Sequence, residues 1–116
     1  MDDQPIIVFI TAPSKEIGKE IASALVEGKL AACVNILGPI NSIYTWEGKI
    51  CDDEEVLLIA KSRLGLFESH LIPAVKAIHP YEIPEIIALP VTMGLHSYLD
   101  WVLGETRISP TELPGG

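Results

Sequence analysis

A heptapeptide in the second half of the chain carries most of the side chains that could do chemistry. Its sequence, His79-Pro80-Tyr81-Glu82-Ile83-Pro84-Glu85, combines an imidazole, a phenol and two carboxylates. The two prolines end the preceding helix and stiffen the segment, because each fixes φ and lacks an amide donor. Such a segment can form one wall of a binding site. It can equally be a rigid helix-to-strand connection whose histidine caps the helix, and residue chemistry alone favours this second interpretation.

Polar side chains on a predicted hairpin are the natural partners of this segment. On an extended strand Glu55 and Lys61 share one face, so an acid and a base bracket an apolar patch. A buried Lys61 needs a carboxylate partner, which Glu55 or Glu85 could supply. A structural ion pair at an interface is the simpler interpretation, but such groups around a concavity also make a pocket. The predicted pocket residues are Tyr44, Trp46, Glu55, Lys61, Tyr81 and Glu85.

The sequence offers few candidates for metal or nucleophilic chemistry. The possible ligands are Cys33, Cys51, His70, His79, His96 and the acidic run 52–55. None has the close spacing of a dedicated zinc or calcium site. The acidic run alternates between two faces of a strand and reads as a solvated hairpin arm. No activated serine or cysteine and no phosphate-binding loop is evident, so the sequence does not support an enzyme.

Composition narrows the class of protein further. The chain has 116 residues with 48% hydrophobic content, which fits one domain with one core. A net charge of −8 with only eight Lys and Arg argues against a nucleic-acid partner. No apolar run approaches the roughly 20 residues of a membrane span, and the first residues lack the basic start of a signal peptide. We therefore expect a cytoplasmic protein, no membrane partner, and two cysteines that remain thiols.

Hydrophobic patterns predict strands and helices in alternation. Ser14 is a good helix N-cap, Gly28 a C-terminal stop, and Glu47-Gly48 a hairpin turn. Gly38-Pro39 requires an edge strand or a bulge, and Pro73 predicts a kink or a late helix start. The predicted elements are strands at 5–11, 30–44, 49–62 and 85–91, and helices at 14–28, 66–78 and 97–103. Residues 1–104 form one domain in this prediction, and 105–116 a flexible tail.

The order of these elements predicts an α+β fold. A βαββαβ chain with right-handed crossovers on each side of a hairpin gives a ferredoxin-like sandwich, with two helices on one face of the sheet, here followed by an extra short C-terminal helix. The other face is left uncovered, and an apolar open face indicates oligomerisation. The two hairpin arms also exceed the usual ~5 to 6 residues, so a neighbouring subunit is the natural packing partner.

Four motifs in order resemble those of the CutA divalent-cation-tolerance family. They are Gly28-Lys29-Leu30-Ala31-Ala32-Cys33-Val34-Asn35-Ile36, Ser42-Ile43-Tyr44-Thr45-Trp46-Glu47-Gly48-Lys49-Ile50, the heptapeptide His79 to Glu85, and Tyr98-Leu99-Asp100-Trp101. The resemblance runs from about Ile7 to Leu103. It implies a ferredoxin-like subunit in a tight homotrimer, similar in assembly to the PII signal-transduction proteins. It also implies a role in tolerance to copper and other divalent metals.

The resemblance carries the family's metal ligands over only in part. Copper binding in the family is tied to a cysteine just before the Thr-Ala-Pro turn and to histidines just before the Pro-Tyr pair. Here these positions hold Ile10 and Ile78, and His79 alone remains. Cys33, a carboxylate or a second subunit would have to complete the site. The resemblance thus implies weak binding of Cu(II) or a similar divalent ion and no obligatory cofactor.

Two other functions stay open at this point. One is a PII-like small-ligand sensor or interaction scaffold, with an intersubunit pocket at Tyr44, Trp46, Lys61 and the His79 loop. The other is a structural trimer kept for stability or for anchoring a partner.

Overall fold

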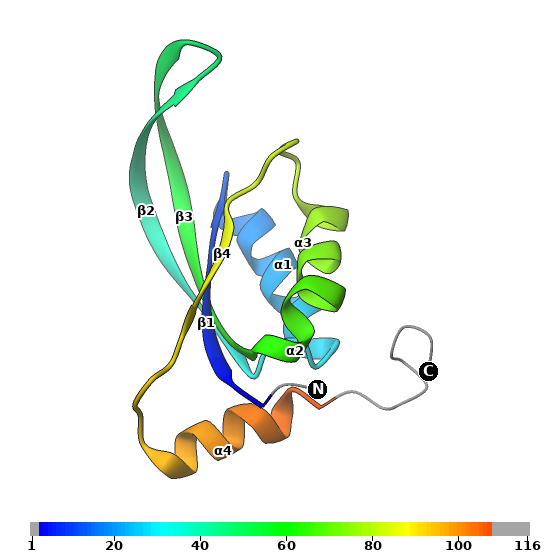
Figure 1. Ribbon diagram of the computed structural model, residues 1–116. Coiled ribbons are helices and arrows are strands. Elements are labelled where there is room, and N and C mark those ends of the chain that lie inside the picture. The colour runs from blue at the N-terminus through cyan, green and yellow to red at the C-terminus, as the bar shows by residue number, and fades with distance from the viewer. Residues whose placement is uncertain (1–2, 108–116) are drawn as a thin grey trace.

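The computed structural model describes residues 3–107, which form one four-stranded antiparallel sheet with helices packed on it. The strand order is β2-β3-β1-β4, and α1 and α3 lie together on one side of the sheet (Figure 1). The strands are β1 (Pro5–Ala12), β2 (Cys33–Trp46), β3 (Lys49–Arg63) and β4 (Ile86–Pro90). The helices are α1 (Lys15–Glu27), α2 (Leu64–Leu66), the π-helical turn η1 (Phe67–Leu71), α3 (Ile72–Ile78) and α4 (His96–Glu105). The predicted βαββαβ order with an added C-terminal helix is confirmed.

The core lies between the sheet and the two helices. Every second residue of β1 is buried, from Ile6 to Ala12, while the residues between them are only half-buried. This alternation follows from the period of two in a strand, which sends neighbouring side chains to opposite faces. Helix α1 closes the core with Ile21 and Leu25, both fully buried. The sequence therefore builds one dry face and leaves the opposite face of the sheet partly open.

Local signals predicted the ends of α1 and the irregularity before α3. The Ser14 hydroxyl accepts a hydrogen bond from the Ile17 amide at 3.2 Å, and Gly28 caps the C-terminus. The predicted helix over 66–78 is divided, with Pro73 in the first turn of α3 and the π-helical turn directly before it. A proline cannot donate to the carbonyl one turn earlier, so it fits best where a helix begins anew.

The β2–β3 hairpin extends beyond the ends of β1 and β4 (Figure 1). Glu47 and Gly48 have positive φ values of 50° and 77°, as a two-residue hairpin turn requires. The register shifts between Leu37 and Ile40, where Gly38-Pro39 has a cis peptide bond. This irregularity lies in β2, an edge strand of the sheet, as the proline predicted.

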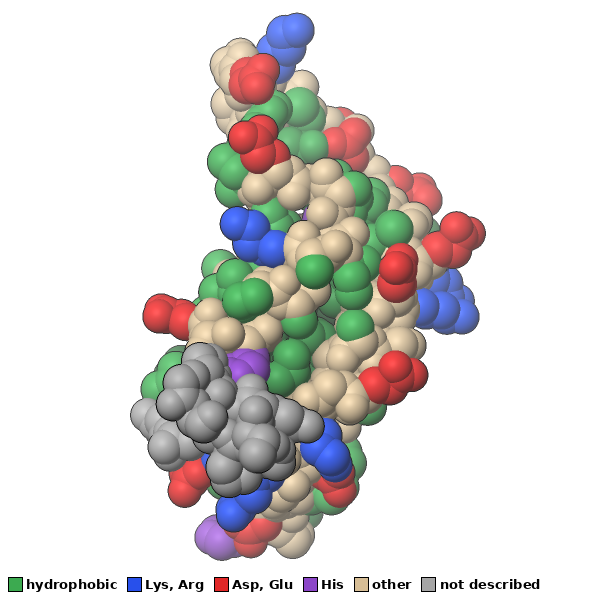
Figure 2. Space-filling model, turned by 90° about the vertical axis from the view of Figure 1, so that its right-hand side faces the viewer, with side chains coloured by type: hydrophobic (Ala, Val, Ile, Leu, Met, Phe, Trp, Pro, Cys, Tyr) green, Lys and Arg blue, Asp and Glu red, His purple; other side chains and the backbone are tan. Residues whose placement is uncertain are grey.

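Helix α4 packs on the face of the sheet opposite α1 and α3, at the end where β3 finishes. It runs longer than predicted, since it includes Glu105, and Thr106 after it is buried and accepts a hydrogen bond from Arg63 Nε at 3.2 Å. Residues 108–116 of the predicted tail lie outside the described residues. Within residues 3–107, no helix has the length and apolar content that crossing a bilayer would need. On the helix side of the molecule, acidic and basic side chains are scattered (Figure 2).

Candidate functional site

A cavity of about 750 Å³ lies between the projecting hairpin and the segment 79–85. We call it the acidic cavity, because Glu47, Glu55, Glu82 and Glu85 line it, and its lining includes no Lys, Arg or His. The other lining residues are Thr11, Asn41, Ser42, Ile43, Tyr44, Trp46, Tyr81 and Ile83. Five of the six predicted pocket residues are therefore brought together here: Tyr44, Trp46, Glu55, Tyr81 and Glu85.

Two phenol–carboxylate pairs stand at this cavity. The Tyr81 hydroxyl donates to Glu55 Oε2 at 3.0 Å, and the Tyr44 hydroxyl donates to Asp53 Oδ2. Asp53 and Glu55 are two residues apart on β3, so they share one face of the strand. Burial and the hydrogen bond to Glu55 raise the pKa of Tyr81 to about 12. The hydrogen bond to Asp53 raises the pKa of Tyr44 well above its usual range, so both phenols are donors at neutral pH.

His79 is held on both sides by the protein itself. Its Nε2 donates to the Thr11 carbonyl at 2.7 Å, and its Nδ1 accepts from the Tyr81 amide at 3.2 Å. The side chain is also buried, and its ring packs against the Tyr81 ring with centroids 4.7 Å apart. A metal ion at either nitrogen would have to replace one of these hydrogen bonds. As placed, His79 fixes the 79–85 segment onto the end of β1.

Lys61 and Cys33 lie apart from the acidic cavity. They face each other across β2 and β3, where Lys61 Nζ donates to Asn35 Oδ1 and Cys33 Sγ lies 3.6 Å from the Tyr98 hydroxyl. Lys61 lies six positions from Glu55 along β3, roughly 20 Å at the usual strand rise. Neither of the two suggested carboxylate partners, Glu55 and Glu85, forms a salt bridge with Lys61 among residues 3–107. Cys33 aligns with Ile7 of β1 and His79 contacts Thr11, so these two possible ligands are roughly 13 Å apart along the sheet.

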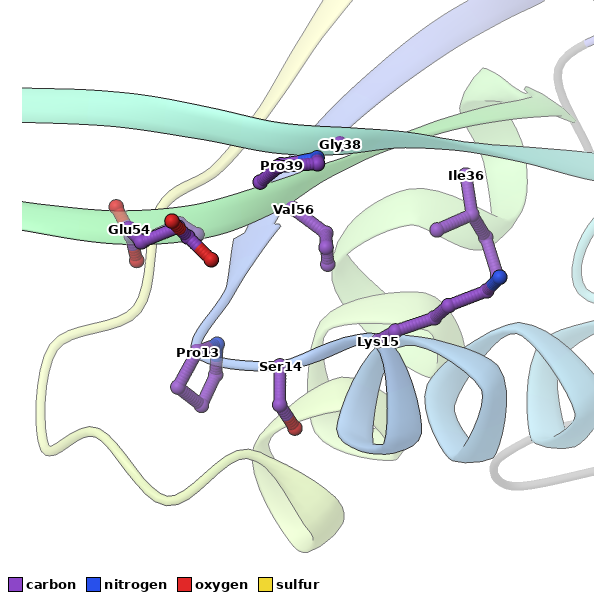
Figure 3. Close-up of a pocket in the computed structure, with 9 residues that line it drawn as sticks. Pro13, Ser14, Lys15, Ile36, Gly38, Pro39, Glu54 and Val56 are labelled. Carbon is purple, nitrogen blue, oxygen red and sulfur yellow. The ribbon is translucent and has the colours of Figure 1, made fainter.

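A second cavity, of about 430 Å³, lies where α1 begins. Figure 3 shows Pro13 and Ser14 on one side of it and Glu54 and Pro39 on the other. Lys15 also lines this cavity, so charges of both signs meet there. The Ser14 hydroxyl is already engaged in capping α1. This cavity therefore has no donor set of one kind to select a ligand.

No group of three or more His, Cys, Asp or Glu within residues 3–107 is placed to hold a metal ion. Glu55 is the exceptional carboxylate, since only 6% of it is exposed and its one hydrogen-bond partner among those residues is Tyr81. Sequence reasoning missed the role of Asp53, which was assigned to a solvated arm. The signal was available: a two-residue turn at 47–48 sets Ser42 opposite Asp53, with Tyr44 on the diagonal.

Comparison with known proteins gives one consistent family. The family model described as "CutA1 divalent ion tolerance protein" matches residues 6–105. The divalent-cation tolerance protein CutA of Thermus thermophilus is 49% identical over 100 residues, which cover 86% of this chain and 96% of that protein. The chloroplastic protein CutA of Arabidopsis thaliana is 50% identical over 102 residues, and the match spans only 56% of that relative's length.

Solved structures agree with the sequence matches. The structure of a divalent cation tolerance protein from Thermus thermophilus superimposes with a TM-score of 0.86 at 48% identity, covering 89% of this chain and 99% of that chain. A CutA structure from Archaeoglobus fulgidus, titled a periplasmic divalent cation tolerance protein, has a TM-score of 0.85 at 44% identity and the same coverage.

Proposed function

The chain belongs to the CutA1 divalent ion tolerance family, which is non-enzymatic, and we propose that it assembles as a homotrimer and binds divalent metal ions weakly at the acidic cavity. The observation that supports this proposal is the lining of the cavity: four glutamates and no basic side chain. Acidic surfaces of this kind attract cations over several ångströms, before any ligand is bound directly.

The donor set determines the strength and type of the proposed binding. Carboxylate and hydroxyl oxygens suit hard divalent cations such as Mn²⁺. Cu²⁺ nevertheless binds most sites of this kind more tightly than Mn²⁺, as the general affinity order of divalent first-row metals predicts. Because fewer than three ligands are preassembled within residues 3–107, the affinity of one subunit should be low. Neighbouring subunits could contribute more donors, since residues of the β2–β3 hairpin line the cavity and this hairpin projects from the sheet (Figure 1).

Calorimetric titration with Cu²⁺ and Mn²⁺ tests the metal proposal. Replacing both Glu82 and Glu85 with glutamine should weaken binding about tenfold or more, because two negative donors are lost. The matched control is Glu20→Gln, which removes an exposed charge on the outer side of α1. His79→Ala distinguishes the two possible sites. If binding is lost in His79→Ala but kept in the double glutamate variant, His79 is the ligand and the carboxylate assignment is wrong.

A small-ligand sensor is the second candidate function. The acidic cavity has the size of typical small-molecule sites, which are about 300–1,000 Å³. Thermal denaturation in the presence of nucleotides and metabolites is the direct screen, because any ligand of the folded state raises the midpoint. Failure of the whole panel would count against this candidate and leave the metal proposal untouched.

We propose that the protein is cytoplasmic, although the names of its relatives give different locations. One relative is called chloroplastic and another periplasmic. The proposal is supported by the two cysteines, Cys33 and Cys51, which are both free thiols. Fractionation of the source cells with a tagged chain would decide it.

A further inference from the structure

We propose that the acidic cavity is also a binding site for an organic ammonium ion, held by the carboxylate of Glu55 and the rings of Tyr44 and Tyr81. This goes beyond the metal-binding proposal, because it assigns a use to the aromatic side chains. The ammonium proposal does not depend on the metal-binding proposal, because a singly charged organic cation needs no cluster of metal ligands.

The first observation is a largely buried carboxylate with one hydrogen-bond partner, whose second oxygen stays accessible, because no fully buried side-chain oxygen among residues 3–107 lacks a partner. Glu55 is 94% buried, and its Oε2 accepts from Tyr81 while its Oε1 has no partner among residues 3–107. Within the same residues, the salt bridges join Arg63 to Asp3 and His96 to Asp100, and none reaches Glu55. A buried carboxylate is costly unless a cation or several hydrogen bonds offset the loss of water. A cation in the cavity could therefore contact the accessible oxygen of Glu55 directly.

The second observation is that exposed aromatic side chains face the same cavity. Tyr44, Trp46 and Tyr81 all line it, and each keeps more than a third of its surface accessible. Ring faces attract cations through their quadrupole. Both phenol hydroxyls donate to carboxylates, and the Tyr81 ring also packs against His79, so the exposed remainder of the two rings is the contact surface left for a ligand.

The third observation is that the tyrosine rings are held in place. Tyr81 is fixed by its hydroxyl on Glu55, by its amide on His79, and by the packing of its ring against the imidazole. Tyr44 is fixed across the hairpin by Asp53. A preorganised pair of rings beside a buried charge loses little conformational entropy when a ligand binds.

These three observations favour an ammonium group over a hydrated metal ion near Glu55. Ring faces cannot coordinate a divalent metal, but they stabilise a weakly hydrated alkylammonium, and aromatic sites for quaternary ammonium groups use this chemistry. The lining also lacks any basic group that would repel such a ligand. The expected ligand class is thus a small amine or quaternary ammonium compound.

Choline is the probe, and 3,3-dimethyl-1-butanol, its uncharged isostere, is the control ligand. Calorimetry of the full chain in its native assembly, in the presence of EDTA, should show choline binding about tenfold more tightly than the isostere. EDTA removes metal ions, so the outcome does not depend on the metal proposal. Equal affinities, or no binding of choline, would overturn the ammonium site. If a basic side chain of a neighbouring subunit already pairs with Glu55, choline will not bind, and this outcome also overturns the ammonium site.

Two pairs of variants locate the binding. Glu55→Gln keeps the shape and an acceptor for Tyr81 but removes the charge, and should weaken choline binding about tenfold, whereas Glu54→Gln, on the opposite face of β3, should not. Tyr44→Leu should weaken binding about fivefold, while Tyr44→Phe, which keeps the ring but loses the hydrogen bond to Asp53, should weaken it clearly less. Thermal denaturation of each variant checks the fold. Equal effects within either pair would contradict the assignment.

Discussion

At the scale of single residues, the three tyrosines should all ionise late. The hydrogen bond to Asp53 raises the pKa of Tyr44, burial raises the pKa of Tyr81 to about 12, and the contact with Cys33 raises the pKa of Tyr98. In the unfolded chain all three should titrate near the usual value of about 10. Ultraviolet absorbance at pH 10 should therefore show little tyrosinate in the folded protein, and about half-ionised tyrosine in denaturant.

This difference has a defined effect on stability. Because the folded protein binds these protons more tightly, the tyrosines stabilise it fully below pH 10. For Tyr81 this contribution disappears as the pH rises from about 10 to about 12. Glu55→Gln should lower the pKa of Tyr81, since both its hydrogen bond and its charge raise that value. An equal tyrosinate signal at pH 10 in the native and denatured protein would contradict the described hydrogen bonds.

At the scale of elements, Gly38 allows β2 to approach β3. A Cβ at this position would lie 2.7 Å from Val56 Cγ1, and valine has no flexible end that could move away. Gly38→Ala should therefore lower the free energy of unfolding by about 1–3 kcal/mol, as overpacking does. Gly104→Ala in α4 is the matched control, because its Cβ would meet nothing within 4 Å. Gly38→Ala should have a lower melting temperature than Gly104→Ala. Equal melting temperatures would show that the hairpin shifts to accommodate the added methyl group without loss of stability.

Arg63 joins β3 to α4 and to the N-terminal segment. It is 2% exposed, and its guanidinium donates to Asp3 at 2.5 Å, to Thr106 and to the Leu103 carbonyl. Lysine keeps the charge but cannot reach three partners in a plane. Arg63→Lys should therefore destabilise the fold by about 1–3 kcal/mol in chemical denaturation. The exposed Arg107→Lys should change nothing, and a similar loss in both variants would contradict this role.

At the scale of the whole molecule, the parts that the sequence could predict were those set by local signals. Alternating hydrophobicity, the Ser14 cap, and the turn at 47–48 led to the correct element order and hairpin. Five of the six predicted pocket residues line one cavity, and the alternation of strand faces helped to group those on the hairpin. Contacts between side chains that are not neighbours on one strand face were not predictable in this way. Glu55 and Glu85 were considered as partners of Lys61 by chemical type alone, although the strand rise already places Glu55 roughly 20 Å from Lys61.

Arg63 was missed for a similar reason. Its partners lie 40 to 60 positions away in the chain, and its position at the end of an apolar strand gives no sign of them. The same arginine binds Thr106, directly after α4, a helix that was expected to end at 103 and ends at Glu105. Such contacts depend on how α4 crosses the sheet, and no pattern within one element encodes that crossing.

The open face of the sheet leads to the last prediction, which concerns assembly. Ile87 and Leu89 of β4 pair with Phe9 and Ile7, on the face opposite the core, and both remain 53% exposed. A monomer rarely leaves such a patch in water, so the proposed trimer should bury it. Ile87→Lys places a charge there and should release single chains of 12.6 kDa in analytical ultracentrifugation. Val26→Lys is the matched control, since Val26 is similarly exposed but lies on α1. The control should sediment as the parent protein does, with a melting temperature that rises with concentration. If both variants keep the parent mass, the contact between copies lies elsewhere; if the parent itself sediments as a single chain, the proposed trimer is wrong.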